Sequence, residues 1–380
     1  MKNKKKLLMC YHSSEYGGVE QQILDIISKL KDDLEIYVVC PDGAMVKKYL
    51  EAGAVWHLNI KPKFEADLGY SLKIKKIIKD KKIDIVHSHE LLTGSLATFG
   101  GFLGGCPKRI YHVHTPFGQW RYSVAKKFPA LVVNTIVNAV VGNFFATDVI
   151  ALTPYIKKLR ITKEFINPNK IKVIPNGVDL KKFENIHEFR NQARQKYGIR
   201  SEEFVIGNIS RFTAEKSHEL LIKSFAEINK IFSETKLFLA GGGILLDDMK
   251  KLSRKLKIEH KVIFTGRFEE EEKCEILSAM DCFAFTSSAE GFGIALIEAM
   301  AAGVPVVSSD LPVLKDVGGI GIKYFNANSQ DSLISALKSI ISNREESNEM
   351  ANKAKNFVKK YSMENFYSNY RELYLGKVQS

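Results

Sequence analysis

The sequence has few cysteines, and they follow no pattern. The five are odd in number and scattered, with no Cys-x-x-Cys pair and no histidine at metal-ligand spacing beside them. A disulfide framework or a Cys–His metal site requires such spacing, so neither is indicated. Isolated thiols of this kind are typical of a reducing cytosol.

Long hydrophobic runs are also absent. The first apolar run, 7–11, is too short for the core of a signal peptide and predicts a strand instead. Polar residues interrupt the most apolar stretch, 128–152, which excludes a membrane span. Because Asn134 and Asn138 lie four residues apart, this stretch predicts a buried helix with one polar stripe, or an interfacial helix. We therefore expect a cytoplasmic protein that is not exported.

Two common nucleotide-binding motifs are missing. No Gly-x-Gly-x-x-Gly follows the first predicted strand, and no glycine-rich loop ends in Gly-Lys-Ser/Thr. Hydride transfer and ATP hydrolysis therefore lose their main sequence support. No known nucleic-acid-binding module is present either, so nucleic acid is not the expected partner.

What the chain does have is positive charge. Its 380 residues carry a formal net charge of +13. Much of the excess lies early, at 2–6, 73–82, Lys126, Lys127, Lys157, Lys158 and Arg160. Such a bias favours phosphorylated small molecules or an anionic membrane surface as partners, although compositional drift alone also produces basic faces.

Short apolar runs alternate with helical patterns along the whole chain. The predicted strands of the first half are 6–11, 36–40, 83–87, 109–114 and 149–152, with helices such as 19–30 and 72–80 between them. The pattern then restarts, with strands at 204–209, 236–240, 261–265, 282–286 and 305–308 and helices near 219–232, 247–257, 271–278 and 294–301. This alternation indicates βαβ units, and hence two doubly wound, Rossmann-like α/β domains that meet near 174–179. Ligands of such folds bind at the carboxyl ends of the strands, here in a cleft between two facing sheets.

The strongest local motif is the segment 287–307. A predicted strand end delivers Glu290, a Gly-Phe-Gly turn follows, and a helix carries Glu298 eight residues further on. Two carboxylates so placed suit the hydroxyl groups of a sugar and of a ribose. The alternative is that Glu290 caps the helix and Glu298 lies on a solvated face, but the run around Glu298 is otherwise apolar.

Three further groups lie at predicted strand ends. Arg211 and Lys216 follow the first strand of the second domain, where they suit two phosphates. Gly17 and Gly18 open the first helix, where bare backbone can approach an anion. Finally, strand alternation places His112 and His114 on one face of their strand, and likewise places His87 and His89 on one face of theirs. His87, His89 and the neighbouring Glu90 do not form a complete metal-ligand set, so an acceptor-side or packing role is expected for this pair.

Together these motifs resemble the large Glu-x7-Glu family of retaining GT-B glycosyltransferases, the family 4 type that includes bacterial mannosyl- and glucosyltransferases. The resemblance covers nearly the whole chain. It implies that Glu290 contacts the donor sugar, that Glu298 contacts the ribose, and that His114 lies near the transferred group. It also implies a donor-binding set made of Gly17, Gly18, Arg211, Lys216, Glu290, Gly291, Phe292, Gly293, Ile294 and Glu298, with catalytic roles for His114, Glu290, Arg211 and Lys216.

The resemblance also implies that each domain binds a different substrate. Residues 1–178 are expected to form an acceptor-binding domain on which a helix near 362–376 packs, and residues 179–361 a domain that binds the nucleotide sugar. Three positions depart from the family pattern: Ser217 replaces a usual glycine, 241–243 is Gly-Gly-Gly, and Thr286 stands where proline is common. None of these removes a charged ligand-binding side chain, but together they leave the choice of donor open.

The expected activity is transfer of a hexose-type sugar, with retention, from a UDP- or GDP-linked donor to a carbohydrate or lipid-linked acceptor. Cell-surface polysaccharide or glycolipid biosynthesis is the expected setting, at the inner face of the membrane. No cofactor is expected, and no metal, because no Asp-x-Asp motif occurs. A nucleotide-sugar epimerase of the same architecture and a non-catalytic binding protein remain alternatives. The segments 61–69 and 117–130 are expected to select the acceptor.

Overall fold

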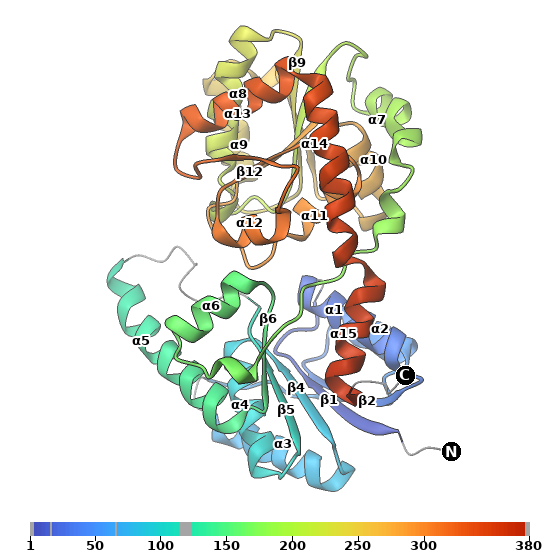
Figure 1. Cartoon of the computed structure of the whole chain (residues 1–380), viewed down its shortest axis with the longest axis vertical. Coiled ribbons are helices and arrows are strands. Elements are labelled where there is room, and N and C mark those ends of the chain that lie inside the picture. Colours follow the sequence, from blue (N-terminus) through green and yellow to red (C-terminus); the bar gives the residue numbers. More distant parts are fainter. Residues whose placement is uncertain (1–3, 16, 65–66, 115–123, 377–380) are drawn as a thin grey trace. The chain divides into compact units, whose positions relative to one another are not determined.

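The structure is a computed structural model that describes residues 4–15, 17–64, 67–114 and 124–376, with only the backbone described in 124–131. It divides into two compact units. The first contains the residues up to Asn176 together with those from Glu364 onward, and the second contains Gly177–Met363. Each unit is a parallel sheet flanked by helices (Figure 1), which confirms the predicted pair of Rossmann-like α/β folds.

The sheet of the first unit has seven parallel strands in the order β3-β2-β1-β4-β5-β6-β7. Their bounds are β1 Lys5–Cys10, β2 Leu34–Cys40, β3 Trp56–Asn59, β4 Ile85–His89, β5 Lys108–His112, β6 Asp148–Ala151 and β7 Ile171–Val173. The inner strands are buried on both faces, which explains their continuous apolar runs. The sequence patterns missed β3 and β7, the two edge strands.

The helices of the first unit are α1 Gly18–Leu30, α2 Ala44–Ala52, α3 Leu68–Lys81, α4 Leu91–Leu103, α5 Val124–Val140, α6 Pro154–Thr162 and α15 Met363–Leu375. Helix α15 comes from the far end of the described sequence. It is fastened by an ion pair between Arg371 and Asp33, whose Nε and Oδ2 lie 2.8 Å apart. Tyr370 and Tyr374 are buried against the first unit. The core of this unit is therefore built from both ends of the sequence.

The apolar stretch 128–152 is not one buried helix, so that prediction was wrong. Helix α5 ends at Val140, a π-helical turn follows, and β6 begins at Asp148. Within the described side chains the polarity is also reversed. Ile136 is exposed, whereas Asn138 is buried and accepts a hydrogen bond from the Tyr111 hydroxyl at 2.6 Å. Asn138 therefore anchors the helix, whereas Val132, Val133, Ile136 and Val140 are exposed.

The sheet of the second unit has six parallel strands in the order β10-β9-β8-β11-β12-β13. Their bounds are β8 Phe204–Ile209, β9 Thr235–Ala240, β10 Val262–Gly266, β11 Cys282–Phe285, β12 Val306–Ser309 and β13 Lys323–Phe325. The helices are α7 Arg190–Lys196, α8 His218–Ile231, α9 Leu246–Lys255, α10 Lys273–Ser278, α11 Ile294–Ala301, α12 Pro312–Gly318, α13 Gln330–Ser342 and α14 Arg344–Phe357. Helix α8 packs on the core through Leu221, Ile222 and Phe225.

The two sheets share one strand order. In each, the chain builds outward in one direction for three strands and then crosses back to the other side of the first strand. The crossing lies between β1 and β4 in the first unit and between β8 and β11 in the second. Loops diverge at such a point and leave a crevice at the carboxyl edge of the sheet, which is where ligands bind.

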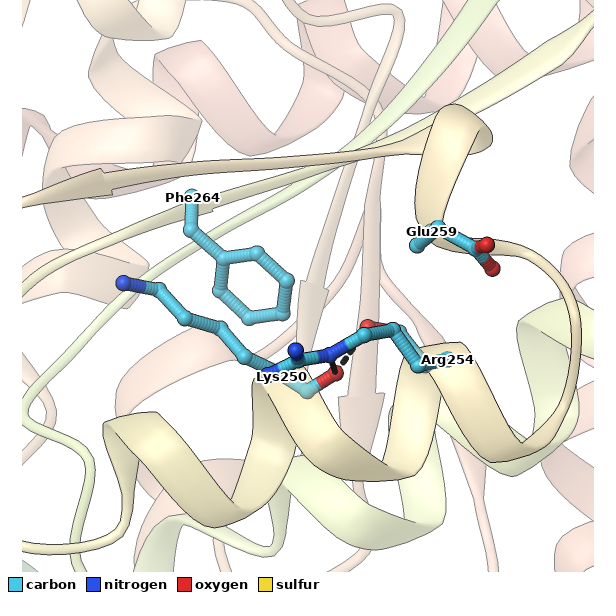
Figure 2. A pocket seen from close by; sticks show the side chains of 5 residues that line it. Lys250, Arg254, Glu259 and Phe264 are labelled. Carbon is cyan, nitrogen blue, oxygen red and sulfur yellow. Dashed lines mark hydrogen bonds between the residues drawn. The ribbon is translucent and has the colours of Figure 1, made fainter.

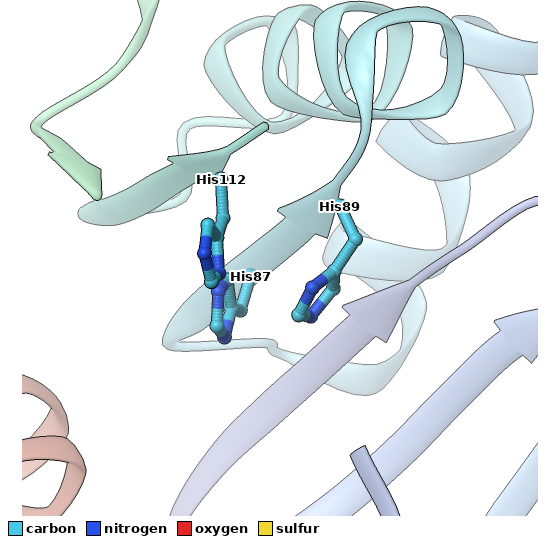
Figure 3. A group of neighbouring side chains, drawn as sticks. All are labelled: His87, His89 and His112. Atoms are coloured by element: carbon cyan, nitrogen blue, oxygen red, sulfur yellow. The ribbon is translucent and has the colours of Figure 1, made fainter. Parts of the chain in front are cut away.

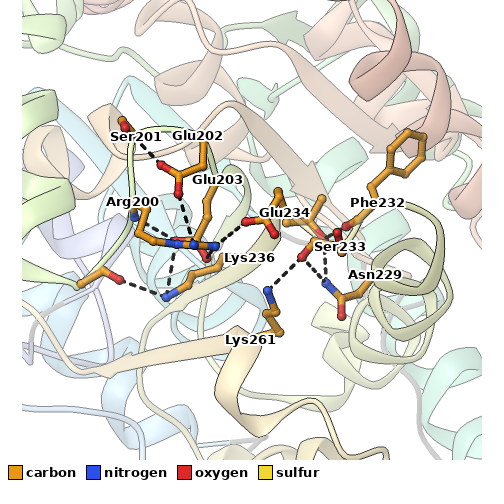
Figure 4. A network of polar contacts seen from close by, with 12 residues as sticks. Arg200, Ser201, Glu202, Glu203, Asn229, Phe232, Ser233, Glu234, Lys236 and Lys261 are labelled. Carbon is orange, nitrogen blue, oxygen red and sulfur yellow. Dashed lines mark hydrogen bonds and ion pairs between the residues drawn. The ribbon is translucent and has the colours of Figure 1, made fainter.

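The amino edge of the second sheet is closed by ion pairs instead (Figure 4). The Lys236 ammonium lies 3.6 Å from the buried Glu203 carboxylate and donates to the Gly198 carbonyl at 3.0 Å. Arg200 pairs with both Glu203 and Glu234. Because these charged groups pair with one another, they are not available to a ligand. We therefore expect the functional residues of this unit at the carboxyl edge of the sheet.

Among the described residues, no helix combines the length and the apolar composition that crossing a bilayer requires.

Candidate functional site

The carboxyl edge of the second sheet brings Lys216 and Glu290 together. Lys216 lies in the loop after β8, and Glu290 lies in the loop after β11. The Lys216 ammonium donates to both carboxylate oxygens of Glu290 at 2.9 Å, and each side chain is only 14 % exposed. The same ammonium lies 5.6 Å from the centre of the Phe285 ring. Two predicted site residues, 74 positions apart, thus form one partly buried ion pair.

Backbone contacts fix this pair by joining the two loops. Thr286 donates its hydroxyl to the Lys216 carbonyl at 2.9 Å. Ser288 donates its backbone N–H to the Glu215 carbonyl at 2.7 Å. The positions of Lys216 and Glu290 therefore do not depend on their side-chain contact alone.

The backbone at Ser217 shows what the replacement of the family's usual glycine changes. Its backbone is left-handed, with φ 53° and ψ 40°, and it leads directly into α8. Glycine adopts this conformation without strain, whereas a side chain raises its energy. The turn therefore keeps its shape at some cost in stability, and the substitution leaves Lys216 in place.

Arg211 differs from Lys216 in being exposed. Among the described residues, none forms a hydrogen bond or ion pair with its guanidinium. Its backbone, in contrast, is tightly held, because the glycine loop after β9 packs against it. A Cβ on Gly241 would lie 2.0 Å from the Ser210 carbonyl oxygen, and one on Gly243 would lie 2.6 Å from the Phe212 nitrogen. The triple glycine thus positions an arginine whose side chain is free to meet a ligand.

The Gly-Phe-Gly turn ends at Gly293, directly before Ile294, which is the first residue of α11. Gly293 has φ +96°, which favours glycine, and no side chain caps the helix that follows. The first N–H groups of an α-helix lack partners within the helix, so Ile294 offers a donor at this edge. Phe292 is buried and packs edge-on against Tyr361, with ring centres 5.5 Å apart. The backbone of the turn, rather than the Phe292 side chain, is therefore the part available to a ligand.

Glu298 lies on α11 and is buried, with 6 % of its surface exposed. The Lys273 ammonium lies 2.7 Å from its carboxylate and 2.6 Å from that of Glu270. Burial raises the pKa of Glu298, and the Lys273 charge opposes that shift. Burial also tends to lower the pKa of Lys273, but its two acidic neighbours raise it overall. The sequence left open that Glu290 caps the helix and that Glu298 lies on a solvated face. Both alternatives are wrong, because no side chain caps α11 and Glu298 is buried.

In the first unit, Gly17 and Gly18 are exposed at the start of α1. Sequence reasoning gave no role to Glu20, yet this carboxylate folds back beside them. It is buried, accepts a hydrogen bond from the Ser13 hydroxyl at 2.5 Å, and lies 2.4 Å from where a Cβ of Gly17 would stand. A side chain at position 17 would therefore require the Glu20 carboxylate to move from this place.

His114 lies just beyond β5 and is 7 % exposed. Its Nε2 lies 3.0 Å from Nδ1 of His89, and its ring stacks on that of His112 with centres 3.8 Å apart. Burial lowers the pKa of His114 well below its usual value, and His89 and Arg160 add to this shift. His114 is therefore a neutral imidazole in the native state.

Glu90 follows β4 and lies close to the same group. Its φ is +64°, an unusual value for a residue with a side chain, and its N–H donates to the His112 carbonyl at 2.8 Å. Burial raises the pKa of Glu90 to about 7, and Glu20 raises it while Arg160 lowers it. A strained, partly buried carboxyl at a strand end is typical of a functional edge rather than a packing position.

Two shallow hollows lie away from these residues. One is lined by Lys250, Ser253, Arg254, Glu259 and Phe264 on α9 and β10 (Figure 2). The other lies at the amino ends of β1, β4, β5 and β6. Neither contains a predicted site residue, so both are surface features rather than the candidate site.

The segment 117–130 and residues 65–66 of the other acceptor segment lie outside the residues or side chains that the structure describes. The predicted role of 117–130 in selecting the acceptor, and the contribution of Lys126 and Lys127 to the basic partner surface, remain predictions. Sequence reasoning also missed Lys273, because a lysine 25 positions before Glu298 carries no local signal.

Comparison with known families supports the same two-part division. A model described as Glycosyltransferase Family 4 matches residues 16–182. A model described as Glycosyl transferases group 1 matches residues 189–357. The second region contains Arg211, Lys216, Glu290 and Glu298.

Individual proteins are similar over most of the chain. The alpha-monoglucosyldiacylglycerol synthase of Streptococcus pneumoniae is 28 % identical over 82 % of this chain and 70 % of its own length. An Escherichia coli enzyme named UDP-Gal:alpha-D-GlcNAc-diphosphoundecaprenol alpha-1,3-galactosyltransferase is 26 % identical over 84 % of both chains. The crystal structure of Anabaena HepE with UDP and glucose superposes with a TM-score of 0.82 at 20 % identity, covering 97 % of this chain and 99 % of HepE. At 20 % identity, the similarity to HepE shows the fold alone.

Proposed function

The chain belongs to the GT-B glycosyltransferases of the group 1 and family 4 type, and from this premise we propose that it transfers a hexose-type sugar, with retention, from a UDP- or GDP-linked donor to an acceptor hydroxyl. The observation that carries the proposal is the partly buried pair of Lys216 and Glu290 at the carboxyl edge of the second sheet. An ammonium and a carboxylate held together there suit the phosphate and the sugar hydroxyls of one donor.

The donor then has a defined set of contacts. Arg211, Lys216 and the N–H groups at the start of α11 bind the diphosphate, because all of them present positive charge or donors at one sheet edge. Glu290 accepts hydrogen bonds from the sugar, and Glu298 accepts them from the ribose. Lys273 acts through Glu298 by keeping that buried carboxylate ionised and oriented.

The transfer step depends on stabilisation of the negative charge that develops on the leaving diphosphate. As the acceptor hydroxyl attacks the anomeric carbon, the bond to the donor phosphate breaks and negative charge grows on the leaving diphosphate, whose departing oxygen accepts the hydroxyl proton. Front-face attack, on the same side as the leaving group, retains the configuration. Arg211, Lys216 and the first turn of α11 stabilise the developing charge without a metal ion. The neutral His114 imidazole contacts the transferred sugar, with Gly17 and Gly18 on the phosphate side.

The acceptor is proposed to be lipid-linked, in cell-surface polysaccharide or glycolipid biosynthesis. The names of the Streptococcus pneumoniae and Escherichia coli relatives refer to a glycosyldiacylglycerol and to a diphosphoundecaprenol. Helix α5 of this chain adds support, because Val132, Val133, Ile136 and Val140 are exposed along it. We propose that this apolar row and the basic residues of the first unit dock on the anionic inner face of a membrane.

Vesicle sedimentation tests the docking. The protein is expected to bind vesicles rich in anionic lipid at low salt and to dissociate at high salt. A Val133→Asp/Ile136→Asp variant should lose this binding, whereas Ile231→Asp, at a similarly exposed apolar position in the second unit, should keep it. No binding by the unaltered protein at low salt contradicts docking and leaves sugar transfer untouched.

Nucleoside diphosphate release from a panel of UDP- and GDP-sugars tests the transfer itself. We expect one donor to be consumed when a suitable lipid-linked or carbohydrate acceptor is present, with the product retaining the anomeric configuration of the donor. Interconversion of the nucleotide sugar without acceptor identifies an epimerase instead. Donor binding without turnover for any acceptor identifies a non-catalytic binding protein.

A further inference from the structure

A group of buried histidines in the first unit remains unexplained by sugar transfer. His87 and His89 lie on β4, and His112 lies on the neighbouring β5 in register with His89. All three are fully buried, and one nitrogen from each ring lies within 4.8 Å of the others. Figure 3 shows the three imidazoles lying together beside the two strands.

The hydrogen bonds of two of these rings leave one nitrogen open on each. Nδ1 of His87 lies 2.7 Å from the Tyr374 hydroxyl, and Nδ1 of His89 lies 3.0 Å from Nε2 of His114. With Nδ1 as the donor in both contacts, Nε2 of each ring presents a lone pair. Among the described residues, neither Nε2 has a hydrogen-bond partner. A ring held at one nitrogen and open at the other is the arrangement found in metal-binding histidines.

His112 completes the group. Within the described part of the chain, both of its ring nitrogens are buried without a partner. Unsatisfied polar atoms in a protein interior cost free energy, and four such nitrogens stand side by side here. Apolar side chains at these strand positions would avoid that cost, so a ligand that engages the nitrogens accounts for them.

The chemistry of the open nitrogens favours a transition-metal cation as that ligand. Imidazole nitrogen is a common protein ligand of such ions, and each open Nε2 presents a lone pair to the space shared by the three rings.

We propose that His87, His89 and His112 bind one divalent transition-metal ion of the zinc type, with a fourth position left for water. Zn–N bonds of about 2.0–2.1 Å bring ligand nitrogens closer than their present spacing. The rings of His87 and His112 also lie nearly parallel, with an interplanar angle of 7°, so the side chains must rotate to converge on one ion. The Tyr374 hydroxyl and His114 orient the ligating rings. The ion would join β4 to β5 and, through Tyr374, to α15. The ion is separate from the diphosphate chemistry proposed above.

The purified full-length protein tests the proposal without any donor sugar. Metal-free protein is titrated with Zn²⁺ in competition with a chromophoric chelator, and with Co²⁺ as an optical probe. We expect one equivalent to bind, with the visible absorption of a four-coordinate cobalt site. His112→Gln should lose this binding, whereas His260→Gln, at an exposed position in the second unit, should keep it.

Two results would overturn the proposal. One is absence of stoichiometric binding by the folded, unaltered protein, which would leave buried water as the partner of the nitrogens. The other is unchanged binding by His112→Gln. If that variant does not fold, X-ray absorption of the zinc-loaded native protein decides instead: a shell of imidazole nitrogens supports the site, and sulfur ligands contradict it. Neither readout depends on transferase activity.

Discussion

Lys216 and Glu290 form an ion pair in which one ammonium lies 2.9 Å from both oxygens of one carboxylate, at the edge of the sheet where a donor is proposed to bind. A diphosphate and a sugar hydroxyl must therefore share or replace this contact. The pair holds the two groups in place beforehand, so little conformational freedom is lost when the donor arrives.

Lys216→Ala and Glu290→Ala are each expected to lower sugar transfer by at least roughly tenfold, because both side chains are proposed to contact the donor in the transition state. The double variant should lose less than the product of the two single losses, since the residues act as a unit. Initial rates with the identified donor measure this. Lys223→Ala, which removes a lysine from an exposed pair on α8, is the control, and native rates in either folded single variant refute the assignment.

Lys273→Met is expected to destabilise the protein by about 3–5 kcal/mol, because it leaves the buried Glu298 charge without its counter-ion. Adding Glu298→Gln should restore part of that loss. Urea denaturation near neutral pH gives both values, and Lys251→Met, at an exposed pair, should change little. A negligible cost for Lys273→Met would mean that Glu298 is not ionised in the native state.

Ser217→Gly is expected to raise the free energy of unfolding by up to about 1 kcal/mol, because relief of the left-handed backbone exceeds the added flexibility of the unfolded chain. Thermal unfolding measures the change, and Ser201→Gly is the matched control, since its φ is not positive. If both glycines destabilise the protein equally, the strain assigned to Ser217 is absent. Transfer activity should persist in both variants.

His218 is expected to make stability depend on pH. Burial, together with Lys216, lowers its pKa from the ordinary 6.5 to about 4. The unfolded chain therefore takes up a proton first, so this contribution is complete above pH 6.5 and is lost as pH falls toward 4. The shift corresponds to a change on the order of 3 kcal/mol. The stability difference between native protein and His218→Gln should narrow over that interval; a constant difference from pH 7 to 4 would exclude the effect.

Sugar transfer is expected to survive a chelator, because protein groups rather than a metal are proposed to stabilise the leaving diphosphate. Rates before and after EDTA treatment at 25 °C measure this. The melting temperature provides a second readout, since removal of an ion from His87, His89 and His112 should lower it. Loss of turnover that is restored by a divalent ion would show that the reaction itself needs a metal.

The sequence predicted most of the inner framework because burial on both faces gives strands continuous apolar runs. β8 was predicted at its observed bounds, as was helix α11. The edge strands β3, β7 and β13 were missed, since each has three or four residues and mixed burial. Such strands are specified by the neighbour they pair with, and a local pattern does not contain that information.

The candidate site shows the same limit. Local motifs pointed to Lys216 and Glu290 separately, but their pairing depends on β8 and β11 being neighbours, which only the sheet order shows. Each histidine pair was predicted to share one face, yet the group around His89 and His112 forms because β4 pairs with β5 in that register. Sequence spacing indicated which residues take part, and the strand order brings those residues together.

Helix α15 gives this protein a distinctive order of assembly. Tyr374 contacts His87 across 287 positions of sequence, so the ribosome makes the whole second unit before it makes the residue that covers the histidines of the first. The second unit, which is continuous in sequence, can fold while the chain is still being synthesised. The first unit cannot complete its fold until α15 emerges, and until then its histidines and strand edges stay accessible to solvent and chaperones. The first unit therefore depends on protection of its exposed strand edges for longer than the second unit does.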